Sequence, residues 1–462
     1  MQQSYNQAAD RLTTTPSRMN GQKRILVLSW LTYCLAYTLR VNIAVVIPAI
    51  IADFGYSYMQ MGLVTSLYFV TYMFGQLING YLGDRVSSRL LIVIGLTGSA
   101  LCNLGAALAP SYAILAICWG LNGLFQSMLW APLMKTLSVW FHGYQLERVS
   151  FIMALSVIIG YAISWGASSI LTTHLGWTYA FFLPVALVLL FTSFMAVLFR
   201  DKPDDTNAAI DIKPAVQPDR AASPDNAESP EIYSSGKIDS TIKVDSSGTS
   251  AEAERLPLLQ FLRMIRLPGL LLIALTQGII REGISIWFPT IIESSGRFAA
   301  GSPWLILVIV PAINLCGVIF VRRVNRFLKS DSIQTLLLIF ALATGTALLL
   351  NLMIIGWFWL ILLVMILLLS LTYGLTPVLT SIIPFQYARF KRVSLTAGLI
   401  DFSIYLGAAI AGLVSGWIAD RYPWSRVMLL WLGAAIIGLA AATWRFYTHK
   451  NKQRFEQSIG HE

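Results

Sequence analysis

The sequence predicts an all-α integral membrane protein in which twelve transmembrane helices form two six-helix bundles. The 462 residues are 56% hydrophobic and only 12% charged, whereas soluble domains carry about 25% charged residues. Apolar stretches of roughly 20 residues, long enough to cross a bilayer as helices, recur along nearly the whole chain. Because these stretches are continuously apolar and do not alternate, a transmembrane β-barrel is excluded.

The predicted spans form two groups of six. The first group is expected at residues 25–53, 58–82, 89–109, 112–140, 146–173 and 177–199, within a bundle at residues 25–200. The second group is expected at residues 267–292, 302–323, 332–353, 357–386, 393–419 and 425–446, within a bundle at residues 267–447. The equal numbers suggest a duplicated architecture.

A polar linker at residues 201–266 separates the two groups. Residues 201–256 are rich in Asp, Ser, Pro and Ala and poor in aromatics, so they bury too little apolar surface to offset their conformational entropy. We expect the linker to be largely disordered. The stretch PLLQFLRMIRLPG that ends it is short, basic and apolar, which is typical of a segment lying along the membrane surface.

Positive charge is concentrated on one side of the predicted spans. The connections near residues 54–58, 110–112 and 354–357 contain no Lys or Arg, whereas the alternate connections contain clusters of them. This asymmetry predicts a multi-pass protein of the cell (inner or plasma) membrane with both tails, residues 1–24 and 448–462, in the cytoplasm. It also accounts for the net charge of +10 without a nucleic-acid partner. Residues 1–24 show no cleavable signal, so the first span is expected to direct insertion.

Catalytic and metal-binding motifs are missing from the sequence. The four cysteines, at positions 34, 102, 118 and 316, all fall within predicted spans and are interpreted as packing residues. We find no phosphate-binding loop, nucleophile triad or metal cluster. We therefore expect a protein that is not an enzyme and needs no cofactor or metal.

Two arginines occupy equivalent positions in the two groups. RVNIAVVIPAII begins at Arg40 and REGISIWFPTII begins at Arg281, and the two segments share the arginine, a proline eight residues later and several isoleucines. Apolar matches alone mean little in so hydrophobic a chain. The shared arginine and proline make an internal repeat credible.

Both arginines are predicted near the middle of the bilayer. A charge there costs about 2.5–3.5 kcal/mol on insertion scales, so it should face protein or water. Transporters built from two repeats bind substrate near the midplane, between the repeats, and an arginine stays protonated. The pair therefore favours an anion as the substrate and argues against efflux of cationic drugs.

The alternative is structural pairing with the intramembrane carboxylates Glu282 and Asp401. Glu282 is not expected to pair directly with Arg281, because neighbouring side chains in a helix point about 100° apart. Both carboxylates are also candidates for proton coupling, since buried acids change protonation readily. A packing role for Asp401 and an ion pair for Glu282 remain open alternatives.

GYLGDRVSSR, at residues 80–89, resembles the cytoplasmic loop signature of the major facilitator superfamily. The resemblance implies that Asp84, Arg85 and Arg89 act in gating and not in substrate binding.

A narrower resemblance is to the organophosphate:phosphate antiporter family. It is carried by Tyr33, Tyr37, Arg40, Asn42 and Pro48 in the first span, by FQSMLWAP (125–132), by REGISIWFPT (281–290) and by Tyr405 to Gly407. In that family two arginines hold the substrate phosphate among tyrosines. The resemblance implies a substrate site made of Arg40, Arg281, Tyr33, Tyr37, Tyr72, Gln76, Trp130 and Tyr405.

Two positions depart from that family's pattern. Gln76 stands where the family has a lysine. The histidine that the family has in its fifth helix is replaced here by Leu155 or Ser156, near the matching position. These departures remove one cation and one titratable group that serve recognition of a dianion. A monoanionic carboxylate, or a different phosphorylated compound, therefore becomes a plausible substrate. The related anion:cation symporters are similar to this chain in having a first-helix arginine.

We therefore expect a monomeric secondary transporter that moves a small organic anion by alternating access, with a co-transported proton or a counter-anion. The alternative is a transporter-like receptor that senses an anion and signals through a partner, as some members of the family do.

Overall fold

The computed structural model describes residues 16–141, 143–203, 262, 267–297, 303–352, 358–387 and 393–459. The expected disordered linker therefore lies almost entirely outside the described residues.

Every regular element of the described part is a helix. The first half contains α2 (Pro16–Thr38), α3 (Asn42–Phe54), α4 (Tyr58–Arg85), α5 (Ser88–Ala107), α6 (Tyr112–Gln126), α7 (Trp130–Trp140), α8 (Gly143–His174) and α9 (Tyr179–Leu198). The second half contains α11 (Leu267–Ser294), α12 (Trp304–Phe327), α13 (Ser332–Leu352), α14 (Phe358–Pro377), the π-helix η2 (Val378–Ile382), α15 (Ile383–Phe385), α16 (Val393–Ala419) and α17 (Trp424–Ile459).

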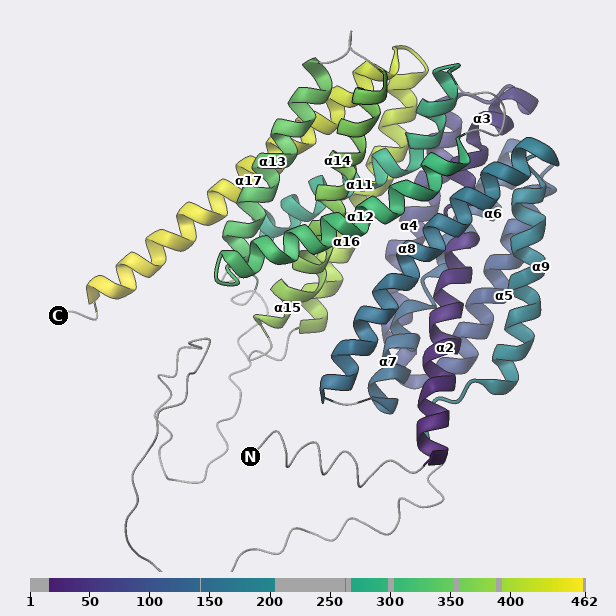
Figure 1. Cartoon of the computed structure of the whole chain (residues 1–462), viewed down its shortest axis with the longest axis horizontal. Coiled ribbons are helices and arrows are strands. Elements are labelled where there is room, and N and C mark those ends of the chain that lie inside the picture. The colour runs from purple at the N-terminus through teal and green to yellow at the C-terminus, as the bar shows by residue number, and fades with distance from the viewer. Residues whose placement is uncertain are drawn as a thin grey trace, which may run out of the picture.

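These helices make 12 segments long and apolar enough to cross a membrane, counted over the described residues. The all-α class and the twelve spans are thus confirmed. Figure 1 shows the two halves side by side, with α2 to α9 in one and α11 to α17 in the other. The helices α3, α4 and α8 of the first half pack against α11, α16 and α12 of the second half, respectively.

Three predicted spans are not single α-helices. The first is interrupted at residues 39–41, the fourth at residues 127–129, and the tenth continues from α14 through a π-helical turn into α15. The last helix continues to Ile459, so the tail expected from residue 448 onward is helical over most of its length. The interruption in the first span matters most, because it contains Arg40.

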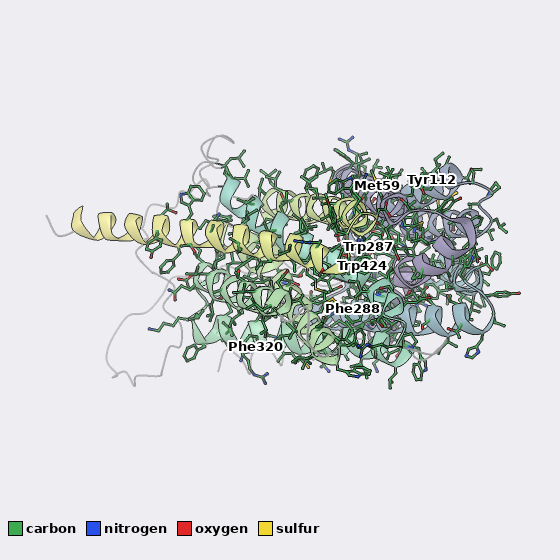
Figure 2. The ribbon with its side chains drawn as sticks, turned by 90° about the horizontal axis from the view of Figure 1, so that it is seen from above. Met59, Tyr112, Trp287, Phe288, Phe320 and Trp424 are labelled. Carbon is green, nitrogen blue, oxygen red and sulfur yellow. The ribbon has the colours of Figure 1, made fainter. Side chains whose placement is uncertain are left out.

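The two halves touch closely at one end of the molecule, which we name the closed end. It is formed by the start of α4, the end of α16 and the start of α17. The backbone N–H groups of Tyr58 and Met59 donate hydrogen bonds to the two carboxylate oxygens of Asp420, at 2.7 and 3.0 Å. The rings of Tyr58, Trp287 and Trp424 contact one another with centroid separations of 5.3 to 6.1 Å. Figure 2 shows Met59, Trp287 and Trp424 grouped where the halves meet.

Small residues bring α4 and α16 together below the closed end. A Cβ atom on Gly62 would lie 2.3 Å from the carbonyl oxygen of Gly412, so only glycine permits this approach. The Ser66 hydroxyl donates a hydrogen bond to the carbonyl of Ala409 at 2.6 Å. Farther along, the contact continues to the ring pair Phe74–Phe402. Toward the opposite end the halves diverge, and α7 and α15 lie apart in Figure 1.

Candidate substrate site

Arg40 lies in the interruption between α2 and α3, not within a continuous helix as the sequence suggested. Interrupting a helix inside a membrane frees backbone carbonyls that must find partners. Asn103 of α5 and Asn122 of α6 both donate side-chain hydrogen bonds to the carbonyl of Leu39, at 3.0 and 2.8 Å. Gln126 donates to the carbonyl of Ala36 at 2.9 Å. These buried amides stabilise the interruption and thereby position Arg40.

These amides were not among the functional residues predicted from the sequence. Ser99 completes the group: its hydroxyl donates to Asn122 at 2.6 Å and accepts from Gln126 at 2.9 Å. The sequence nevertheless contains a signal for them. Three amide side chains lie within two predicted spans, where polar groups are costly unless they have partners.

Four tyrosine rings surround the Arg40 guanidinium. The carbon Cζ of Arg40 lies 4.7 to 5.7 Å from the ring centroids of Tyr37, Tyr68, Tyr72 and Tyr405. These distances fall within the range of cation–π attraction. The Arg40 Nη2 also donates a long hydrogen bond of 3.5 Å to the Tyr405 hydroxyl, which belongs to the other half. Among the described residues, no carboxylate forms an ion pair with Arg40.

Arg281, in contrast, has a carboxylate partner. Its Nε and Nη2 atoms both donate to Oε1 of Glu282, at 2.9 and 2.7 Å. The expectation that these neighbours would not pair is therefore wrong, because the long side chains turn toward each other in a site where both are buried, with exposures of 7% and 6%. Arg281 Nη1 also donates to the Thr376 hydroxyl at 2.9 Å, one residue before Pro377, where the π-helical turn follows.

A cavity of about 30 Å³ lies between the halves. Arg40, Tyr68, Tyr161 and Trp119 line it from the first half, and Glu282, Ser285 and Ile286 of α11 line it from the second. Arg281 is not among its lining residues. This volume accommodates roughly two water molecules, so an organic substrate requires the halves to move apart.

The remaining predicted substrate residues extend from Arg40 in two directions. Tyr33 contacts Trp130 at 4.6 Å between centroids and Tyr37 at 5.4 Å. Tyr72 contacts Tyr405 at 4.6 Å. The Gln76 amide donates a 3.4 Å hydrogen bond to the Tyr72 hydroxyl. The structure thus brings these residues into one continuous cluster with Arg40, although Arg40 is the only one of the eight predicted substrate residues that lines the cavity.

Asp401 lies on α16 one helical turn before Tyr405 and is half-buried. Its carboxylate interacts electrostatically with Arg281 and does not line the cavity.

The gating residues lie at the far end of α4. Arg85 and Arg89 are exposed, and the Arg89 backbone N–H donates to the Asp201 carboxylate at 2.8 Å. The side chain of Asp84 lies outside the described part of the structure. The gating role of these three residues stays a prediction.

Comparison with known proteins adds the family context. A sequence profile described as Major Facilitator Superfamily matches residues 29–388. The glycerol-3-phosphate transporter of Bacillus subtilis is 25% identical over 88% of this chain and 89% of its own length. A probable hexose phosphate transport protein of Chlamydia trachomatis is 26% identical over 39% of this chain, and the match spans only 40% of that relative. The membrane sensor protein UhpC of Escherichia coli is 24% identical over 39% of this chain and 42% of its own length.

Solved structures agree with the fold. The nucleoside transporter NupG superposes with a TM-score of 0.66, covering 92% of this chain and 99% of that chain at 14% identity. An inward-facing, occupied structure of a bacterial homologue of the lysosomal transporter Spinster gives a TM-score of 0.65 at 13% identity, covering 95% of this chain and 98% of that chain. At these identities the likeness concerns the fold alone.

Proposed function

Because this chain belongs to the Major Facilitator Superfamily, we propose that it is a secondary transporter that moves a small organic anion across the plasma membrane by alternating access. The proposed substrate is either an organophosphate or an organic carboxylate. The relative with the most extensive coverage reported above is a glycerol-3-phosphate transporter, which supports an anionic substrate.

The observation that carries the proposal is the environment of Arg40. Its guanidinium is held in a helix interruption between the halves, inside a ring of tyrosines, and no carboxylate in the described structure neutralises it. Discontinuous helices at membrane depth are typical of transporter substrate sites. A buried charge without a fixed partner is costly unless it serves a ligand. We infer that an anion binds Arg40, with Tyr72, Tyr405 and Gln76 beside it. Arg281, which does not line the cavity in this conformation, would contribute to the site from the second half.

The closed end supports alternating access. Contacts between the halves run from Asp420 and Tyr58 to Phe74 and Phe402, while the halves diverge at the other end. If both termini are cytoplasmic, as the charge distribution predicts, this is an inward-facing state. Rocking of the halves about Arg40 would open the closed end and close the other, and Asp84, Arg85 and Arg89 would stabilise one of the two states.

Coupling is proposed to involve a proton or a counter-anion. Glu282 contacts Arg281 and Asp401 interacts with it electrostatically, so these two carboxylates are the candidates for the coupling group. The protein is proposed to act as a monomer, since each chain contains both halves of the site.

A sensor that binds an anion without transporting it is the second candidate, supported by the similarity to UhpC over part of the chain. Flux measurements in proteoliposomes distinguish the two. We expect uptake of radiolabelled organic anion by wild type and none by Arg40→Ala. The matched control is Arg421→Ala, which removes an exposed arginine just past the end of α16. Its guanidinium donates to the carbonyl of Trp417 and lies over the Trp417 ring. Binding without flux in wild type would favour the sensor, and uptake by Arg40→Ala equal to wild type would reject the site.

A further inference from the structure

We propose that Glu282 sets the charge selectivity of the site, so that the substrate is a monoanionic carboxylate and not a phosphate monoester dianion. This inference rests on the proposed function and narrows its substrate class. The organophosphate relatives would then share the fold and the arginines but not the preferred charge of the ligand.

Glu282 and Arg281 form a buried ion pair. One carboxylate oxygen accepts from two nitrogens of the guanidinium at 2.9 and 2.7 Å, and both side chains are more than nine-tenths buried. Separating such a buried pair leaves uncompensated charge and is strongly unfavourable. The positive charge of Arg281 is therefore largely satisfied before any ligand arrives.

Glu282 also lies on the wall of the cavity. Glu282, Ser285 and Ile286 lie on one face of α11 and line the cavity, whereas Arg281 does not. An organic anion that enters this cavity after the halves move apart meets Arg40 directly. It meets the carboxylate of Glu282 before the guanidinium of Arg281.

The net charge of the site favours a ligand with a single negative charge. Arg40 and Arg281 contribute two positive charges and Glu282 one negative charge, which leaves one positive charge for the ligand. The other polar groups on the wall, including Tyr68, Tyr161 and Ser285, are uncharged in their ordinary forms. Asp401 interacts with Arg281 from outside the wall and can only lower the total. A phosphate monoester carries about −1.5 to −2 charges at neutral pH, so it would leave a buried net negative charge.

The experiment compares ligands of matched skeleton. Binding to the purified full chain is measured by calorimetry for glycerate against glycerol 3-phosphate, and for gluconate against glucose 6-phosphate. We expect wild type to bind the carboxylate of each pair more tightly. In Glu282→Gln we expect the affinity ratio to shift toward the phosphate by about tenfold or more, since one negative charge is removed from a poorly screened site.

Two variants serve as controls. Glu282→Asp keeps the charge and should keep the carboxylate preference. Asp401→Asn removes a carboxylate that does not line the cavity, and should shift the ratio less than Glu282→Gln. A wild type that prefers the phosphates, or a Glu282→Gln ratio equal to wild type, would overturn the inference. If Glu282→Gln does not fold, the inference is tested by the affinity ratios of wild type and Glu282→Asp, both of which should favour the carboxylate.

The proposed function fails by a different result. If no anion of either pair binds wild type, or if Arg40→Ala binds them as tightly as wild type, the anion site itself is wrong. If anion binding depends on Arg40 but the carboxylate-to-phosphate affinity ratio does not change in Glu282→Gln, only the proposed selectivity is contradicted.

Discussion

Asp420, at the end of α16, caps the N-terminus of α4 at Tyr58, although the two residues belong to different halves of the molecule. A carboxylate that accepts from the first N–H groups of a helix satisfies donors that have no intrahelical partner and interacts favourably with the helix dipole. Here the cap exists only while the closed end is closed. It therefore links a local hydrogen-bond pattern to the global conformation.

Asp420→Ala is expected to favour opening of the closed end. A reporter is Ser66→Cys in a background without native cysteines, because Ser66 is buried between α4 and α16. We expect its rate of alkylation by a membrane-impermeant maleimide to rise about fivefold, corresponding to loss of a cap worth about 1 kcal/mol.

Asp331→Ala is the matched control for that experiment. Asp331 caps α13 through the N–H groups of Ile333 and Gln334, entirely within the second half. Its loss should lower thermal stability without changing the alkylation rate. Equal rates in Asp420→Ala and wild type would show that the cap does not hold the closed end.

Asn122→Leu should weaken substrate binding through the backbone at Arg40. The change preserves side-chain size but leaves the carbonyl of Leu39 with one donor fewer and Ser99 without its acceptor. Leaving such buried groups unsatisfied costs about 1–3 kcal/mol. We expect a lower melting temperature together with a higher dissociation constant for the anion.

Asn351→Leu provides the comparison. Asn351 donates to the carbonyls of Ala347 and Met428 in the second half, far along the chain from Arg40. A similar loss of stability with unchanged affinity is expected. If both variants weaken anion binding equally, the interruption at residues 39–41 has no special role.

Gln76→Lys should raise the affinity for phosphate dianions independently of Glu282. Gln76 hydrogen-bonds the Tyr72 hydroxyl, and the Tyr72 ring is the one nearest the Arg40 guanidinium. A lysine there would add one positive charge beside the site. Calorimetry with glycerol 3-phosphate should show about tenfold tighter binding, whereas Gln76→Met, of similar length and neutral, should show no gain.

Tyr405→Phe and Tyr405→Leu separate the two contacts of this residue with Arg40. Phe removes the hydroxyl that accepts the 3.5 Å hydrogen bond but keeps the ring over the guanidinium. Because the hydrogen bond is long, we expect a small effect of Phe on uptake and a larger one of Leu, which also removes the ring contact with Tyr72. Equal uptake by both variants would contradict a role for the ring.

The sequence predicted the class of fold and the number of spans, because apolar length is a local property of the chain. The family resemblance pointed to Tyr37, Tyr72 and Tyr405 but not to Tyr68, the fourth ring around Arg40. The sequence did not predict the interruption at residues 39–41, since Leu39 and Val41 are not helix breakers. That interruption depends on Asn103 and Asn122, which are distant in sequence. The Arg281–Glu282 contact was missed because average helical directions ignore how far two long, buried side chains can bend toward each other.

The last helix, α17, runs without a break for 36 residues, or about 54 Å, and Figure 1 shows it projecting beyond the bundle at the end where the halves diverge. The projecting end of α17 moves with the second half, and the start of α2 moves with the first half. A donor fluorophore near residue 16 and an acceptor near residue 459 would therefore magnify a small hinge rotation into a readable change in energy transfer. The length of α17 thus makes the relative movement of the two halves measurable in single molecules.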